Sequence, residues 1–323
     1  MEEQSKKNQK SIRKEAGRIG RGLIGYSIIT FVVVIVHLFI LESRWADKYP
    51  GATEQDATYI QMMENFENSG TSSMIGVGLG VVFLLFFFRK RINVSSIVHA
   101  EKKMNATAFF QLLCVFMGGQ LLFSTVGELL EKGLNLFGYS ALACMESASS
   151  VSTTLSMFLY SSIIGPIAEE LVYRGFVLRS FQKYGKIAAI VVSSVLFGVM
   201  HANIPQSIFA FGVGMVLGYV AVEYSIVWSV LLHIINNCIF CDVFGWVTSG
   251  FNEQIQEVLS VGVFAAFAVA GAVVLWRKRE VVKTFCGENR TEKGIYVHIF
   301  SALGMIFFIA GELGMAILML EKV

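Results

Sequence analysis

The sequence predicts an all-α, polytopic membrane protein: a bundle of about nine transmembrane helices with a cytosolic N-terminus. Two observations carry this prediction. Hydrophobic residue types make up 54% of the 323 residues and charged types only 15%, with a mean hydropathy of +0.62, whereas soluble domains carry about 25% charged residues. Apolar stretches close to the ~20 residues that span a bilayer also recur along the chain. These runs are continuous rather than alternating, so a porin-like barrel is excluded together with a soluble globular enzyme.

Nine apolar segments divide the chain, and all are expected to be helices because only helices and closed barrels satisfy the backbone in lipid. They cover approximately 22–41, 73–88, 107–126, 151–176, 187–203, 208–223, 227–246, 258–276 and 295–320. When residue 1 is placed inside, the inner loops hold 22 of the 26 Lys and Arg residues and the outer loops hold 4. Because Lys and Arg concentrate in cytoplasmic loops, this asymmetry predicts a cytosolic N-terminus and an outer C-terminus.

A carboxylate pair stands at bilayer depth, where each ionisable group costs about 2.5–3.5 kcal/mol on insertion scales and therefore marks a candidate site. Glu170 and Arg174 are four residues apart, in the favourable order for a helical ion pair. Glu169 points ~100° away on the helix and is not committed to that pair, which suits a general base acting on water. Pro166 is expected to bend the helix just before the acids. The alternative, a structural Glu–Arg pair, explains only one of the two acids.

Imidazole and amide groups follow on later segments. Phe197 and His201 end a long apolar run, and His233 and Asn237 share one helix face. Hydrogen-bonding groups of this kind stabilise an oxyanion. The alternatives are a structural His201 and a polar contact that joins two helices through His233 and Asn237. The coincidence of all three motifs favours chemistry, although neither the H-E-x-x-H zinc motif nor the G-x-S-x-G serine motif is present.

The motifs Glu-Glu-x-x-x-Arg (169–174), Phe-x-x-x-His (197–201) and His-x-x-x-Asn (233–237), in this order, resemble the CAAX-protease and bacteriocin-processing family (CPBP or Abi) of intramembrane endopeptidases. The resemblance covers roughly residues 155–245. It implies hydrolysis of a peptide bond at or within the membrane. Some members of the family serve peptide maturation or self-immunity against peptide toxins, and others cut after prenylated cysteines. Nothing in this sequence supports a prenylated substrate.

The resemblance also implies roles for individual residues. Glu169 would activate the water, assisted by His201. His233 and Asn237 would polarise the scissile carbonyl and hold its oxyanion. Supporting roles would fall to three residues around these groups: Glu170, Arg174 and Phe197.

Metal use is left open by the residue types. Glu169, His201 and His233 could form a zinc site with an open position. A single carboxylate cannot easily be both ligand and base, so we expect water activation without a metal and no cofactor. The expected partners are a peptide or membrane-protein substrate and the lipid bilayer, with no nucleic acid, in the plasma membrane of a prokaryote. Two other functions stay open: a transporter with a proton or cation path through the same residues, and a non-catalytic immunity scaffold.

Four regions are expected: a basic cytosolic arm (1–21), N-terminal transmembrane helices (22–150) with an acidic outer loop at 42–72, a catalytic core (151–246) and C-terminal transmembrane helices (247–323). The arm is expected to be a solvated tail, and the acidic loop a solvated, mobile segment. Depths counted along the segments differ for Glu169, His201 and His233, so the helices must tilt, break or begin deeper for these groups to meet. A water-filled cavity open to the cytosol would bring them together.

Overall fold

The computed structural model describes residues 2–89 and 97–323, and nearly all of them are helical. Residues 90–96, which lie between the predicted segments 73–88 and 107–126, are outside the described residues. The first part of the chain forms α1 (Glu2–Lys48), α2 (Ala57–Glu67), α3 (Thr71–Phe88), α5 (Ala106–Asn135) and α6 (Leu142–Ser149). The last part forms α14 (Glu253–Arg277), α15 (Arg279–Glu288), α16 (Ile295–Phe300) and α17 (Leu303–Leu318). Two short antiparallel strands, β1 (Tyr139–Ser140) and β2 (Glu321–Lys322), pair Tyr139 with Lys322.

The middle of the chain alternates between α-helix and the wider π-helix. It consists of α7 (Leu155–Leu159), η1 (Tyr160–Ile164), α8 (Gly165–Glu170), η2 (Leu171–Leu178), α9 (Arg179–Phe181), η3 (Gln182–Tyr184), α10 (Lys186–Val199), α11 (Ile204–Glu223), α12 (Ile226–Ile234), η4 (Ile235–Val243) and α13 (Phe244–Thr248). The segments η1, η2 and η4 are π-helical, and η3 is a 3₁₀ turn. Asparagine side chains cap α5, α11 and α14 by accepting a backbone N–H, which fixes where these helices begin.

The predicted all-α membrane fold is confirmed. Within the described residues, seven helices are long and apolar enough to cross a membrane. These are Gln9–Lys48, Thr71–Phe88, Ala106–Asn135, Leu155–Tyr184, Ile204–Glu223, Ile226–Thr248 and Glu253–Arg277. The two remaining predicted segments fall on shorter apolar helices, Lys186–Val199 and Leu303–Leu318. The last predicted segment, 295–320, is broken between α16 and α17.

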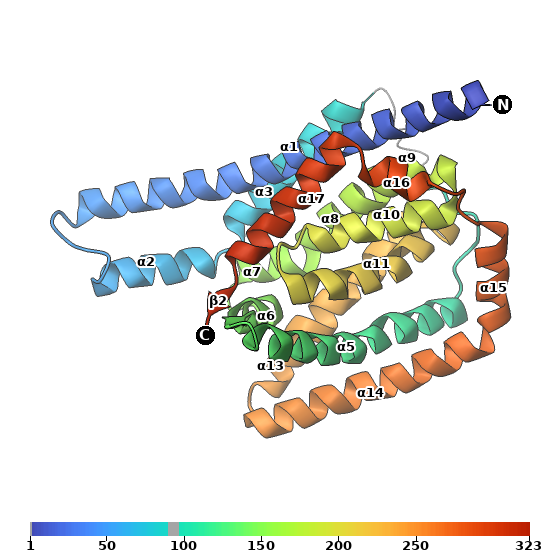
Figure 1. Ribbon diagram of the computed structural model, residues 1–323. Helices are drawn as coiled ribbons and strands as arrows, with labels where there is room; N and C mark the ends of the chain where they lie inside the picture. Colours follow the sequence, from blue (N-terminus) through green and yellow to red (C-terminus); the bar gives the residue numbers. More distant parts are fainter. Residues whose placement is uncertain (1, 90–96) are drawn as a thin grey trace.

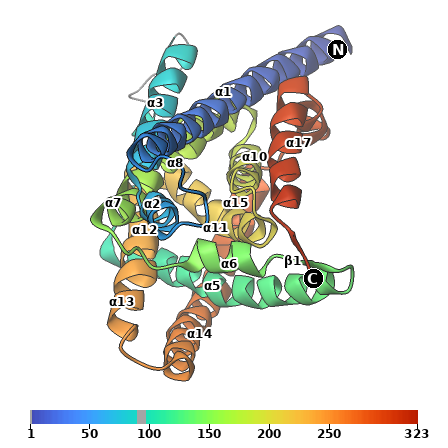
Figure 2. The ribbon, with the colours of Figure 1, turned by 90° about the vertical axis from the view of Figure 1, so that its left-hand side faces the viewer.

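The long helices run side by side, with α1, α3 and α17 on one flank and the α5–α14 pair on the other (Figures 1 and 2). The middle helices α8, α10 and α11 lie between these flanks and contain much of the buried core. The start of α1, the turn before α10 and α15 all lie at one end of the bundle, at the right in Figure 1. We call this the basic end, because residues 2–21, 179–186 and 277–293 are rich in Lys and Arg. The opposite end carries α2, α6 and the C-terminus.

Two segments expected to be irregular are helical instead. Residues 1–21 belong to α1 from Glu2 onward, and Ile12, Ala16 and Ile19 are buried, so the arm is not a solvated tail. Residues 42–72 are not a loop but the end of α1, a turn and α2. Aromatic packing joins the two helices of this hairpin.

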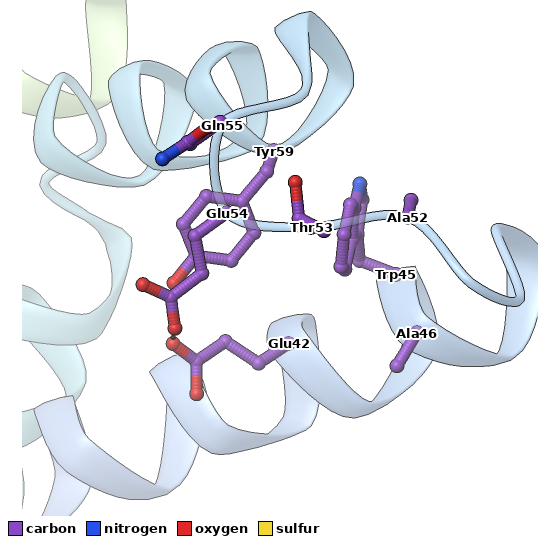
Figure 3. Close-up of a pocket in the computed structure, with 8 residues that line it drawn as sticks. All are labelled: Glu42, Trp45, Ala46, Ala52, Thr53, Glu54, Gln55 and Tyr59. Atoms are coloured by element: carbon purple, nitrogen blue, oxygen red, sulfur yellow. Dashed lines mark hydrogen bonds between the residues drawn. The ribbon is translucent and has the colours of Figure 1, made fainter.

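The hairpin at residues 42–72 is closed by three side chains. The ring of Trp45 packs edge-on against Tyr59, with 5.0 Å between centroids. The Tyr59 hydroxyl donates a hydrogen bond of 3.0 Å to Glu42. Figure 3 shows these residues around the open pocket between α1 and the chain that leads to α2.

Close packing of α1 on α17 depends on glycine. A Cβ added at Gly304 would lie 2.3 Å from the carbonyl oxygen of Gly17, and a Cβ added at Gly20 would lie 2.2 Å from the carbonyl carbon of Gly304. The two backbones therefore touch directly, as small residues permit between membrane helices. This contact joins the first and the last long helices of the chain.

We predict that Gly304→Ala lowers the free energy of unfolding by about 1–3 kcal/mol, because the added methyl forces α1 and α17 apart. Denaturant titration of the purified protein in detergent measures this change. The matched control is Gly311→Ala on the same helix, where nothing lies within 4 Å of the added Cβ. Equal stability of the two variants would contradict the prediction.

Candidate active site

The predicted site residues stand on helices that widen locally into π-helix. The segment η1 ends immediately before Gly165, where α8 begins, and η2 starts directly after Glu170. Pro166 lies in the first turn of α8, where its missing amide hydrogen interrupts the preceding hydrogen-bond pattern. The segment η4 likewise starts two residues after His233. Single π-turns occur often at functional sites because they redirect side chains within a helix.

Glu170 is fully buried and holds three partners. Its carboxylate accepts a hydrogen bond of 2.5 Å from the Ser229 hydroxyl and lies 3.1 Å from Nδ1 of His233. The predicted ion pair with Arg174 is present, with 3.4 Å between Nε and Oε2. A carboxylate accepts hydrogen bonds, so Nδ1 of His233 carries a proton. Glu170 therefore fixes the orientation of the His233 ring.

Glu169 has the opposite environment. Its side chain is 20% exposed, and its Oε2 lies 3.6 Å from Nε2 of His233. The two carboxylates thus approach the two nitrogens of one imidazole, Glu170 from the core and Glu169 from the cavity side. This matches the expectation that Glu169 is not committed to the Arg174 pair.

Phe197 links the charged core to both histidines. The Arg174 guanidinium carbon lies 4.5 Å from the centroid of its ring, a cation–π contact. The rings of His201 and His233 contact Phe197 edge-on, at centroid distances of 5.1 and 5.8 Å. The guanidinium nitrogens of Arg174 make no hydrogen bond within the described chain, so the carboxylate of Glu170 and the face of Phe197 are what balance this buried cation.

His201 lies just beyond the end of α10, in the turn that leads to α11. Its Nδ1 is 2.8 Å from the carbonyl oxygen of Phe197. A carbonyl only accepts, so Nδ1 carries the proton and Nε2 is left as an acceptor. The turn is held by Asn203, whose amide donates to the Cys144 carbonyl at 2.8 Å, and Ala202 adopts a left-handed backbone conformation at φ 47°.

One cavity of about 410 Å³ brings the predicted catalytic residues together. Its lining includes five of the seven predicted site residues: Glu169, Phe197, His201, His233 and Asn237. Glu170 and Arg174 do not line the cavity. Both are fully buried and contact residues that do line it. A volume of this size falls within the range of about 300–1,000 Å³ typical of ligand sites.

The cavity does not extend toward the basic end, which the sequence predicts to face the cytosol. Its lining includes Ser150, which follows α6, and His201, which follows the last turn of α10. It also includes Asp242, ~24 Å along the helix from Ile226, where α12 begins at the basic end. The cavity therefore extends from mid-depth toward the opposite end. Glu169, His201 and His233, one from each motif, all line it.

Asp242 also lines the cavity and is not among the residues predicted from the sequence. It is buried and accepts hydrogen bonds from the backbone N–H of Ser152 at 2.7 Å and from the Ser162 hydroxyl at 2.5 Å. It therefore ties η4 to η1 and to the chain before α7. An acid inside the predicted segment 227–246 meets the same criterion that singled out Glu169, and that signal could have found it.

A relay of amides surrounds Asn237, and two of its members were also missed. Gln120 donates to Asn236 at 2.5 Å, Asn236 donates to Oδ1 of Asn237 at 2.8 Å, and Asn237 donates to the Ser161 carbonyl at 2.8 Å. A carboxamide has two N–H groups. One N–H of Asn237 is therefore committed to the relay, and the second remains for a group in the cavity.

Among residues 2–89 and 97–323, no group of three or more His, Cys, Asp or Glu side chains is arranged to hold a metal ion. The three candidate ligands named from the sequence, Glu169, His201 and His233, form no such group. The Oε2 atom of Glu169 and the Nε2 atom of His233 are 3.6 Å apart.

Comparison with known proteins bears on the same segment. Residues 151–239 match the family model described as "Type II CAAX prenyl endopeptidase Rce1-like". This match confirms the resemblance to the CAAX-protease family. The matched segment contains all three motifs, whereas Asp242 lies three residues beyond it. Together with the apolar helices, the match identifies an integral membrane protein.

A curated relative agrees with the family match. The "Putative membrane peptidase YdiL" of Bacillus subtilis (strain 168) is 28% identical over 83 residues, which are 25% of this chain and 34% of that protein. The match thus spans about a third of the length of the relative. No solved structure matches the chain.

We predict that Asp242→Ala lowers the free energy of unfolding by about 1–3 kcal/mol, because it leaves the buried Ser152 N–H without its acceptor. Denaturant titration in detergent tests this. Asp47→Ala, which removes an exposed acid near the end of α1, is the control and should leave stability unchanged. A variant at Asp242 as stable as this control would show that the carboxylate does not hold η4 to η1.

Proposed function

We propose that the protein is a membrane endopeptidase that hydrolyses a peptide bond of a peptide or membrane-associated substrate in the cavity beside Glu169. The observation that carries this proposal is the contrast between two adjacent carboxylates. Glu170 is buried against Ser229, Arg174 and His233, whereas Glu169 is partly exposed and lines the cavity. One acid is thereby free to exchange a proton with water while the other supports the imidazole.

The reaction begins with a water molecule beside Glu169. The carboxylate takes a proton from this water as its oxygen attacks the scissile carbonyl carbon. His201 assists by accepting a hydrogen bond from the water at Nε2, since its Nδ1 proton is held by the Phe197 carbonyl. When the tetrahedral intermediate collapses, the C–N bond breaks and Glu169 returns the proton to the leaving amine.

The oxyanion of the intermediate is stabilised by His233 and Asn237. Glu170 accepts a hydrogen bond from the Nδ1–H of His233 and fixes the ring, in the manner of an acid that orients a catalytic histidine, and a proton on Nε2 then gives a second N–H for the oxyanion. Asn237 contributes the N–H that the amide relay leaves free. Preorganised donors of this kind are worth about 10²–10³ in rate each.

Glu169→Gln is predicted to lower the rate of cleavage by about 10²–10⁴-fold without loss of the folded protein, because an amide cannot take the proton from water. Membrane and secreted peptides are first compared by mass spectrometry between a wild-type strain and a Glu169→Gln strain. A peptide that differs is then cleaved with purified protein. The control is Glu312→Gln. This carboxylate accepts a hydrogen bond from the Ser27 hydroxyl outside the site, so the variant should retain activity. Undiminished cleavage by Glu169→Gln would remove Glu169 as the base.

We also propose that water activation needs no metal ion, because Glu169, the cavity-lining acid that approaches His233, is assigned to proton transfer. Cleavage of the identified peptide is then expected to persist after prolonged treatment with a zinc chelator, and metal analysis should find no stoichiometric zinc. A loss of activity that added zinc restores would contradict this part of the mechanism.

The physiological role that we propose is peptide processing or self-immunity against bacteriocins, in the plasma membrane of a prokaryote. Its support is the match of residues 151–239 to the endopeptidase family and the similarity to a bacterial protein named as a membrane peptidase.

A further inference from the structure

A second, apolar cavity of about 870 Å³ lies at the basic end, between α5, α11, α14 and α15. Its walls are mainly aliphatic and include Leu112, Val115, Val216 and Val274. None of the predicted site residues lines it. Its volume is in the range of ligand sites, and an apolar hollow of this size favours an apolar occupant over water.

The helix α15 forms one wall and lies across the ends of the long helices, as Figure 1 shows. Val281, Val282 and Phe285 line the cavity from one face of α15. Phe285 packs edge-on against Tyr219 of α11, with 5.2 Å between ring centroids. Val281 nevertheless remains 53% exposed. A short helix that is amphipathic and lies across a bundle end is typical of a segment at the bilayer interface.

The mouth of the cavity is positively charged. Lys278, at the junction of α14 and α15, lines it, and neither Lys278 nor Arg277 forms an ion pair within the described chain. The neighbouring acid Glu280 is already paired with Arg279 and Lys283.

Two further features complete the mouth. Trp276 is 66% exposed and carries the Arg279 guanidinium over its ring at 5.3 Å, as expected of an aromatic anchor at the interface. Glu223, beside the lining residue Tyr224, is buried and bound by both Lys102 and Lys186. The acid next to the mouth is therefore neutralised, and the local charge is that of the free lysine and arginine.

We propose that this cavity binds an anionic phospholipid of the adjacent leaflet, with an acyl chain between α5, α11 and α14 and the phosphate at Lys278. Aliphatic walls match the chain, and the unpaired cation matches the headgroup. A bilayer lipid also covers the exposed apolar side chains of α15, which a soluble anion leaves in water. This inference is independent of the proposed peptidase activity.

Native mass spectrometry of the full-length protein, titrated in detergent with phosphatidylglycerol or phosphatidylcholine, tests the proposal. Wild type is expected to bind phosphatidylglycerol more tightly than phosphatidylcholine. Lys278→Gln should weaken phosphatidylglycerol binding about fivefold, the contribution of one lysine near an anionic lipid surface, and should leave phosphatidylcholine binding unchanged. Val216→Trp, which fills the cavity, should weaken the binding of both lipids.

Matched controls keep the two effects separate. Lys293→Gln removes one charge from the same basic segment outside the cavity. Val269→Trp adds the same bulk on the exposed face of α14. Neither should change lipid binding. Equal binding by the two lysine variants, or an equal affinity of wild type for the two lipids, overturns the charge recognition. If Val216→Trp fails to fold, the comparison of Lys278→Gln with Lys293→Gln still decides the proposal.

Discussion

The burial of one carboxylate, Glu170, is the constraint around which the middle of this protein is arranged. An ion taken out of water costs several kcal/mol, and the cost is recovered only when its partners satisfy its lone pairs. Here those partners come from two elements: Arg174 from η2, and Ser229 and His233 from α12. If any one of these three partners is removed, the buried Glu170 carboxylate loses an interaction that offsets the cost of its burial. The helices α8 and α12 are therefore held in one register, and that register places Glu169 beside His233.

The same constraint separates the roles of two neighbouring acids. Because successive residues on a helix point ~100° apart, the residue before a buried Glu170 must face another direction. In this bundle that direction is the cavity. The Phe197 ring lies between the buried Glu170–Arg174 pair and the cavity. It contacts Arg174 and both histidines. The chemistry proposed for Glu169 thus depends on packing that lies entirely behind it.

The sequence predicted this arrangement in part, and the reasons are particular to each feature. Composition and apolar run length locate all nine helical segments, and the spacing of Glu170 and Arg174 predicts their ion pair. Spacing along one helix does not reveal how helices are offset from each other, so the sequence could not predict that the cavity extends away from the basic end. Gly20, next to the buried Ile19, contacts Gly304, which lies near the other end of the sequence. Asp242 likewise has partners 80 and 90 residues away.

The helix α11 connects the two cavities, because each is lined by a different stretch of it. Phe209, Ala210 and Val213 line the cavity of the candidate active site, and Met215, Val216 and Tyr219 line the apolar cavity at the basic end. Between these stretches Gly214 packs against Phe197, where an added Cβ would lie 3.2 Å from the ring. One helix thus contributes to the walls of both cavities and contacts the ring that packs against Arg174 and both histidines. The packing of α11 on α10 therefore positions side chains that line both cavities, and the close contact of Gly214 with Phe197 is part of that packing.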